Sequence, residues 1–450
     1  MNEVGLKTRQ PSHANVHAIV SRVCTLTLLL SLVINFAPRP FRVALAKPTA
    51  PVPFVSTATR AGRLAVFDDA WSTINQRYYD SAFRGLDWVA QGTRFRALAA
   101  QADSSEELYA VLRSMIAPLA DPHTRVFAPE EKFDWWEPKF VSIGLGVKEI
   151  DGLPTVVQIE PNSAPSRAGI RPGDVIDSVN GQPAALVVSQ RFTNIAPTKA
   201  EKTRAFAAVF NGPAGTSLDL GWKNQHNQQK HARFDRYWQQ RVLGLRVDRV
   251  NRNYLVIEID AFTKPIALSF ARIIKEKLKG TRGVIIDLRN NGGGDAEAMA
   301  EIASTFLGSG VDLGEFTDRS GAGFSLSTSF LTAEPLGAQV PLAVLTSERT
   351  SSAAEIFVAA LKKAKRATVI GTQTCGCVLA IRARHILPDG GVLDVSELDF
   401  KTPAGQRLEG NGIQPDETVV VHRENLYAKH DAALVNAIVQ LKRSLGLDPK

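Results

Sequence analysis

The spacing of apolar and polar positions changes along the chain, and each change predicts a different kind of structure. Between residues 60 and 139 apolar side chains recur at helical spacing, as over 67–74 and 108–116. From residue 141 they alternate with a period of two, which predicts strands. A proline-containing turn at 119–125 breaks the helical pattern near the end of the first region. We therefore expect a small helical domain followed by a β-rich domain.

The last part of the chain, from about residue 240, alternates strand-like apolar runs with helical segments. Such alternation is typical of a layered α/β domain, in which helices cover the faces of a sheet. The fold class that we predict for the whole chain is therefore mixed α/β, with several domains. The expected strands are 255–259, 283–288, 342–346 and 367–371, and the expected helices are 267–278, 296–307 and 353–363.

The first 46 residues have the features of an export signal. Lys7 and Arg9 precede an apolar run at 24–37, and Ala44 and Ala46 provide small residues for cleavage. The run is shorter than the roughly 20 residues that span a bilayer. We expect a cleaved signal peptide, export to the periplasm or another extracytoplasmic space, and no membrane span afterwards. A retained leader that tethers the protein to a membrane stays open.

Composition narrows the classes of protein further. With 450 residues, 44% apolar and 22% charged, the chain has the usage of a globular protein of two or three domains. The leader carries five Lys or Arg and one acidic residue, so it holds half of the formal charge of +8. No basic run interleaved with aromatic residues occurs, which argues against nucleic acid as a partner. Cys24 belongs to the leader, and Cys375 and Cys377 are too few for a disulfide framework. Homo-oligomerisation stays open.

Residues 143–181 combine three strand-like runs with a short helix and a Pro-Gly turn. This segment resembles a PDZ domain, with Gly144, Leu145 and Gly146 as the carboxylate-binding loop. The resemblance implies that consecutive N–H groups bind a peptide's terminal carboxylate while the next strand pairs with the peptide main chain. Polypeptides with accessible C-termini are then the expected partners. The alternative is a small β-domain that serves only as a spacer.

Ser352 lies in a small-residue turn between a predicted strand and a predicted helix. At a helix start backbone N–H groups are unpaired, which suits a nucleophile, although an isolated serine there is ordinarily an N-cap. Upstream, residues 287–295 form an Asn/Gly loop after another strand, and its glycines let backbone N–H groups approach a substrate and stabilise an oxyanion. The helical Glu355 follows the serine by three residues, and a structural role suits it better than a catalytic one.

These segments resemble the carboxyl-terminal processing, or tail-specific, serine peptidases, over roughly residues 60–425. The resemblance implies a crotonase/ClpP-like layered core, Ser352 as nucleophile, and an oxyanion hole made by Gly293 and the N–H of Ala353. Gly294 stays open for the first of these two places. The implied domains are a signal peptide at 1–46, a helical domain at 47–139, an inserted PDZ domain at 140–235 and a peptidase core at 236–450.

The proton acceptor is the open question. Relatives of the lysine type carry a Gly-Lys pair, but here Cys377 follows Gly376, and a thiol of reference pKa about 8.5 is a poor base. The chain also resembles the tricorn protease core, which implies His123 as base and Glu409 as its orienting carboxylate. His123 can instead be a structural turn residue, and Glu409 can brace the final loop.

Cys375 and Cys377 leave several roles open. Their spacing and the absence of partner ligands argue against a metal site, and no cofactor is expected. A disulfide, small-residue packing beside the active site, and a catalytic thiol remain. The function that we predict is an exported serine endopeptidase that binds polypeptide C-termini and cleaves through an acyl-enzyme. The alternative is an inactive PDZ scaffold that lost the lysine.

Overall fold

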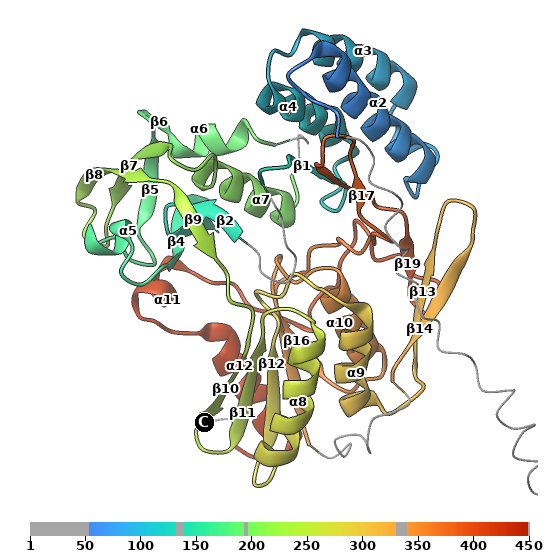
Figure 1. Ribbon diagram of the computed structural model, residues 1–450. Helices are drawn as coiled ribbons and strands as arrows, with labels where there is room; N and C mark the ends of the chain where they lie inside the picture. The colour runs from blue at the N-terminus through green and yellow to red at the C-terminus, as the bar shows by residue number, and fades with distance from the viewer. Residues whose placement is uncertain (1–53, 132–138, 193–196, 330–339, 449–450) are drawn as a thin grey trace, which may run out of the picture. The chain divides into compact units, whose positions relative to one another are not determined.

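The structure is a computed structural model that describes residues 54–131, 139–192, 197–329 and 340–448 (Figure 1). The predicted signal peptide and its cleavage site lie outside these residues. Of the helices in the described ranges, none is both long and apolar enough to cross a membrane.

The first described part contains three helices, α2 (Arg60–Arg77), α3 (Trp88–Gln101) and α4 (Ser105–Ile116). Each begins directly after a Thr, Asp or Ser whose side-chain oxygen accepts a backbone N–H of the first turn, which fixes where the helix starts. Two 3₁₀ turns complete the region, η1 (Phe83–Gly85) and η2 (Ala117–Leu119).

The apolar core of these helices includes residues from the far end of the chain. Strand β1 (Arg125–Phe127) pairs with β18 (Val392–Asp394), which also pairs with β17 (His385–Ile386). Leu393 and Val395 are buried in the same apolar cluster as the helices. The N-terminal helices therefore complete their core with a C-terminal strand pair.

The next part contains a sheet with the order β3-β4-β5-β7-β8, in which β6 pairs with β5. Helix α7 (Lys199–Phe210) packs against the edge strand β3, because Phe206 and Val209 share a buried cluster with Leu145 and Val147. The strands are β3 (Leu145–Ile150), β4 (Leu153–Ile159), β5 (Val175–Val179), β6 (Gln182–Pro183), β7 (Ser217–Lys223) and β8 (Gln229–Asp235). A separate ribbon pairs β2 (Lys139–Ser142) with β9 (Tyr237–Gln240), and the shorter helices are α5 (Ala164–Arg167) and α6 (Ala184–Ser189).

The C-terminal half is built on one six-stranded sheet, in the order β10 (Leu245–Val250), β11 (Tyr254–Ile259), β12 (Gly283–Asp287), β15 (Leu342–Thr346), β16 (Thr368–Gly371) and β20 (Glu417–Thr418). The pairs from β11 to β20 are parallel, and β10 is antiparallel to β11. Its central strands are buried along their whole length, as expected for a parallel sheet covered on both faces.

Helices cover both faces of this sheet (Figure 1). Successive residues of a strand point to opposite faces, so Ile286 packs with one set of helices and Ile285 with the other. The first set is α8 (Lys264–Lys277), α9 (Ala296–Leu307) and α10 (Ala353–Lys363), and α12 (Ala432–Ser444) lies on the second face. A smaller sheet of β14 (Gly323–Ser327), β13 (Asp312–Thr317) and β19 (Asp399–Lys401) and the helix α11 (Arg423–Tyr427) complete the elements.

The predicted mixed α/β fold class is confirmed. Helices α9 and α10 have the bounds expected from the sequence. Helix α8 begins earlier than the predicted residue 267, because the Thr263 side chain accepts the N–H of Ile266 and Pro265 is compatible with a first helical turn.

Candidate active site

Ser352 lies at the turn between β15 and α10 in a backbone conformation that side chains rarely adopt, with φ 57° and ψ −128°. Such a conformation is costly for a residue other than glycine and persists only where its surroundings hold it. Here the Ser352 N–H donates to the carbonyl oxygen of Cys377 at 2.8 Å, and the preceding N–H of Ser351 donates to the Asn291 carbonyl at 3.1 Å. The turn thus holds Ser352, half-buried, in place before the helix.

The loop after β12 approaches this serine with its backbone. Gly293 has φ 98°, and a Cβ atom added to it would lie 2.6 Å from the Ser352 Cβ and 3.1 Å from the Ala353 nitrogen. No side chain fits at this position, which explains the glycine physically.

The N–H of Gly293 already has an acceptor. It donates to Asn291 Oδ1 at 2.8 Å, and Asn291 is itself fully buried. For Gly293 to bind an oxyanion, this hydrogen bond would have to exchange. The neighbouring Gly294, which the sequence left open, is exposed. Ala353 contributes the first N–H of α10, which has no carbonyl partner within the helix.

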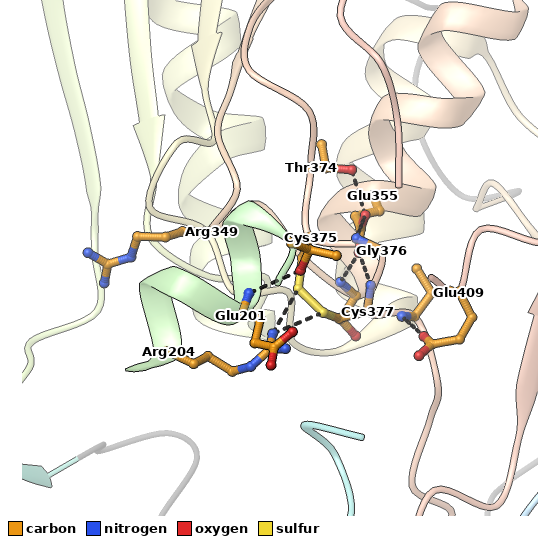
Figure 2. Close-up of a disulfide and its surroundings, with 12 residues drawn as sticks. Glu201, Arg204, Arg349, Glu355, Thr374, Cys375, Gly376, Cys377 and Glu409 are labelled. Carbon is orange, nitrogen blue, oxygen red and sulfur yellow. Dashed lines mark hydrogen bonds between the residues drawn. A yellow bond between two sulfur atoms is a disulfide. The ribbon is translucent and has the colours of Figure 1, made fainter. Parts of the chain in front are cut away.

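Glu355 joins the nucleophile turn to the loop at 374–377 (Figure 2). Its fully buried carboxylate accepts the Thr374 hydroxyl at 2.5 Å and the N–H groups of Gly376 and Cys377 at 2.7 and 2.8 Å. The Ser352 N–H lies 3.2 Å from its second oxygen. Burial raises the pKa of Glu355, and these hydrogen bonds oppose that rise. The structural role predicted for Glu355 fits this arrangement.

Cys375 and Cys377 are joined by a disulfide, one of the roles that the sequence left open (Figure 2). Their Cα atoms lie 5.2 Å apart. Arg204, an exposed residue of α7, places its Nη1 3.7 Å from the Cys375 sulfur and 3.8 Å from the Cys377 sulfur. A sulfur in a disulfide carries no proton and no thiolate, so in this state Cys377 is neither a base nor a nucleophile.

His123 lies in the turn between η2 and β1, with its side chain 15% exposed. Its Nδ1 is buried without a hydrogen-bond partner and lies 3.9 Å from Asp121 Oδ1. Burial lowers the pKa of His123 to about 4, with the charges of Arg125 and Arg204 acting in the same direction and Asp121 opposing them. The imidazole is therefore neutral near pH 7 and able to accept a proton.

Glu409 is buried beside the 374–377 loop, on the side opposite Arg204 (Figure 2). Its Oε2 accepts the N–H of Val378 at 2.8 Å, and its Oε1 lies 3.8 Å from Arg84 Nη1. Burial raises the pKa of Glu409 to about 7, and the nearby charge of Asp121 adds to the rise.

The structure thus brings the three residues predicted to be catalytic, Ser352, His123 and Glu409, to one region without direct contacts between them. Arg204 connects His123 electrostatically to the disulfide loop, and Asp121 influences both His123 and Glu409. Within the described part of the chain, no hydrogen bond joins His123 to Ser352 or to Glu409.

Of the predicted carboxylate-binding loop, Gly144 directly precedes the edge strand β3, and Leu145 and Gly146 are the first two residues of that strand. Gly144 has φ 88°, and its N–H donates to Ser142 Oγ at 3.0 Å. Leu145 and Gly146 pair with β4, which leaves the other edge of β3 facing α7. An edge strand beside a helix is the arrangement that peptide addition to a sheet requires.

One contact that the sequence did not predict joins these same elements to the nucleophile segment. Lys148 of β3 pairs with Glu348 at 2.5 Å, and Thr203 of α7 lies 3.4 Å from the same carboxylate. Burial lowers the pKa of Lys148, while pairing with Lys148 helps to lower the pKa of Glu348 against its own burial. No local pattern in the sequence signals an ion pair between segments so far apart.

Comparison with known proteins gives the family. The model for "Peptidase family S41" matches residues 253–419, and the model for "Tricorn protease C1 domain" matches residues 59–117, which end before His123. Over residues 253–419 the chain therefore matches peptidase family S41. The predicted family and the predicted class of enzyme, a serine-type peptidase, are thereby confirmed.

Named relatives agree with this assignment. The chain is 29% identical over 386 residues to carboxyl-terminal-processing peptidase 2, chloroplastic, of Arabidopsis thaliana, a match that covers 78% of this chain and 68% of the relative. Among solved structures it resembles mature CPAF, with a TM-score of 0.67, 17% identity and coverage of 86% and 98% of the two chains. It also resembles the photosystem II D1 C-terminal processing protease, with a TM-score of 0.51, 22% identity and coverage of 80% and 94%. These structural matches support the fold alone.

Proposed function

We propose that this S41 peptidase is an exported endopeptidase that binds polypeptide C-termini and cleaves peptide bonds through an acyl-enzyme on Ser352. The observation that carries the proposal is the strained backbone of Ser352, which holds the residue between a strand end and a helix start against Gly293. Strain of this kind is maintained where a site requires a fixed geometry.

His123 is the proton acceptor in this proposal. The disulfide removes Cys377 from consideration, and the lowered pKa of His123 leaves its imidazole neutral near pH 7. Its Nδ1 has no partner to give up before it takes a proton. Because His123 and Ser352 are not hydrogen-bonded, we infer that substrate binding brings them together, as catalytic hydrogen bonds often tighten only in the complex.

The reaction then follows from these groups. The Ser352 hydroxyl attacks the scissile carbonyl carbon while its proton passes to His123. The N–H of Ala353, with Gly293 or Gly294, stabilises the oxyanion. Protonated His123 returns its proton to the leaving amine, and water later releases the acyl group by the same steps. The Glu409 carboxylate would stabilise the imidazolium from beside the 374–377 loop.

Residues 140–235, proposed as a PDZ domain, would supply the substrate. The edge of β3 beside α7, which pairs with no other strand among the described residues, supports this role, with Gly144, Leu145 and Gly146 at its start. In the same proposal residues 1–46 are a signal peptide, 47–139 a helical domain and 236–450 the peptidase core. The leader's charge and apolar pattern support an extracytoplasmic location.

A fluorophosphonate probe tests the proposal directly. The wild-type chain should be labelled, Ser352→Ala should not be, and Ser351→Ala serves as a matched control because it removes the adjacent hydroxyl and leaves the turn's backbone bonds. Labelling should be measured with and without a peptide that has a free C-terminus. A folded wild type that resists the probe at every pH and with every peptide would support the inactive scaffold instead.

A further inference from the structure

The Cys375–Cys377 disulfide lies in a loop that does not depend on it for its position. Glu355 binds the N–H groups of Gly376 and Cys377, and the Cys375 N–H donates to the Thr350 carbonyl at 3.0 Å. None of these contacts involves a sulfur atom. Opening the S–S bond would therefore leave both sulfurs close together and ready to close again.

The two sulfurs have different surroundings. Cys377 is buried, with 5% of its surface exposed, whereas Cys375 is only half-buried. An incoming thiolate must reach the sulfur that it attacks, so it reaches Cys375. The electron pair of the broken bond then goes to Cys377.

Arg204 stabilises the thiolate that leaves, while the burial of Cys377 sets the direction of cleavage. The Arg204 Nη1 lies 3.7 Å from the Cys375 sulfur and 3.8 Å from the Cys377 sulfur, and a nearby guanidinium stabilises a thiolate and makes it a better leaving group.

We propose that Cys375 and Cys377 form a redox-active disulfide that is opened by a dithiol, with attack at Cys375 and departure of Cys377 as a thiolate beside Arg204. The attacking thiolate forms an S–S bond to Cys375 as the bond between the two cysteines breaks. The second thiol of the dithiol loses its proton to water. The resulting thiolate attacks the other sulfur of the same dithiol, the one bonded to Cys375, and this releases Cys375 as a thiolate. The protein gains two electrons and two protons in forming two thiols, and the dithiol is oxidised to a disulfide.

This site is independent of peptide hydrolysis, because thiol–disulfide exchange does not require Ser352. It lies nevertheless against the nucleophile turn, where Cys377 accepts the Ser352 N–H. The redox-active cysteine and the proposed nucleophile are thus linked by one backbone hydrogen bond.

The first test counts thiols and locates the attacked sulfur. It uses the full chain with Cys24→Ser, so that only the two loop cysteines react with N-ethylmaleimide. The chain isolated in air should take up no maleimide, and should take up two after treatment with dithiothreitol. After brief treatment with glutathione, followed by excess N-ethylmaleimide to trap the free thiols, peptide mass spectrometry should find glutathione on Cys375 and maleimide on Cys377. Two free thiols in the air-isolated chain, or the reverse distribution of adducts, would overturn the proposal.

The second test measures the contribution of Arg204. Loss of a neighbouring positive charge raises the pKa of the leaving thiol, so Arg204→Gln should slow reduction by dithiothreitol about three- to tenfold. Arg204→Lys should keep most of the rate. Lys202→Gln is the matched control. It removes a positive charge from the same helix, but Lys202 pairs with Glu149 and not with the disulfide. Equal rates in Arg204→Gln and Lys202→Gln would show that Arg204 does not assist. Fluorophosphonate labelling of Ser352 is scored separately, so failure of either proposal is distinguishable from failure of the other.

Discussion

Replacing Glu355 by glutamine should loosen the disulfide loop, and hydrogen exchange of its backbone amides can measure the change. The carboxylate accepts four donors, two at each oxygen. Glutamine keeps one oxygen and replaces the other with an NH₂ group. If that group faces Thr374, the hydroxyl can turn to accept from it, but the N–H of Gly376 loses its acceptor. In the opposite orientation the Cys377 N–H loses its acceptor, whereas the Ser352 N–H keeps the Cys377 carbonyl oxygen.

The magnitude follows from one lost acceptor, because each orientation leaves one N–H of the loop unpaired. Burial raises the pKa of Glu355, so removing the charge is not itself costly, and the cost is the unpaired N–H of Gly376 or of Cys377. One buried unsatisfied donor costs about 1–3 kcal/mol. Since 1.36 kcal/mol corresponds to a tenfold change in an equilibrium constant, local opening of the loop should become about 5- to 150-fold more frequent.

Hydrogen exchange followed by mass spectrometry is the assay. The chain has several separate buried clusters, and this method reports the opening of one segment independently of the others. Peptides that contain Gly376 and Cys377 should exchange faster in Glu355→Gln by this factor. Glu297→Gln is the control, since Glu297 is an exposed carboxylate in the first turn of α9. Exchange within about twofold of the wild type would refute the four-donor account of this carboxylate.

Three further predictions concern the proton acceptor and use the rate of Ser352 acylation by a fluorophosphonate. His123→Ala should lower this rate at least about 100-fold, as expected for loss of a general base, whereas His226→Ala removes an exposed imidazole and should not; equal rates in the two variants would exclude imidazole catalysis at residue 123. The pH profile should show an acid limb near pH 4, below which His123 is protonated, and a further rise through about pH 7 as the Glu409 carboxylate forms. Glu409→Gln should lack the rise near pH 7, and an unchanged profile would contradict its proposed role. Cys377→Ser should keep most of the rate, because the sulfur is not the base, and a loss of more than about tenfold would return that role to Cys377.

The nucleophile segment could be predicted from sequence because its parts are contiguous. Strand, small-residue turn and helix follow one another between residues 342 and 363, and α10 begins and ends where the pattern indicates. The backbone strain at Ser352 was not visible, since it arises from contacts with Gly293 and Cys377 that come from other parts of the chain.

The hydrogen bond that occupies Gly293 was accessible to sequence reasoning. Asn side chains commonly accept the N–H two residues later, so the Asn291-Gly-Gly spacing carries the signal. The contact of Arg204 with the sulfurs could not be predicted from the sequence. Arg204 and Cys375 are 171 positions apart, and their contact depends on how α7 packs against the core. Local patterns predict turns and caps, whereas charges that meet across domains require the fold.

The strand pair that completes the N-terminal core also sets when that core can form. During synthesis α2, α3 and α4 emerge first, but Leu393 and Val395 must be made before their apolar cluster closes. His123 lies in the turn directly before β1, whose only pairing partner among the described strands is β18. The turn that carries the proposed base is therefore anchored only after the nucleophile has been translated. A nascent or truncated chain would carry the Ser352 turn without a fixed His123, and it would be unable to cleave neighbouring chains prematurely.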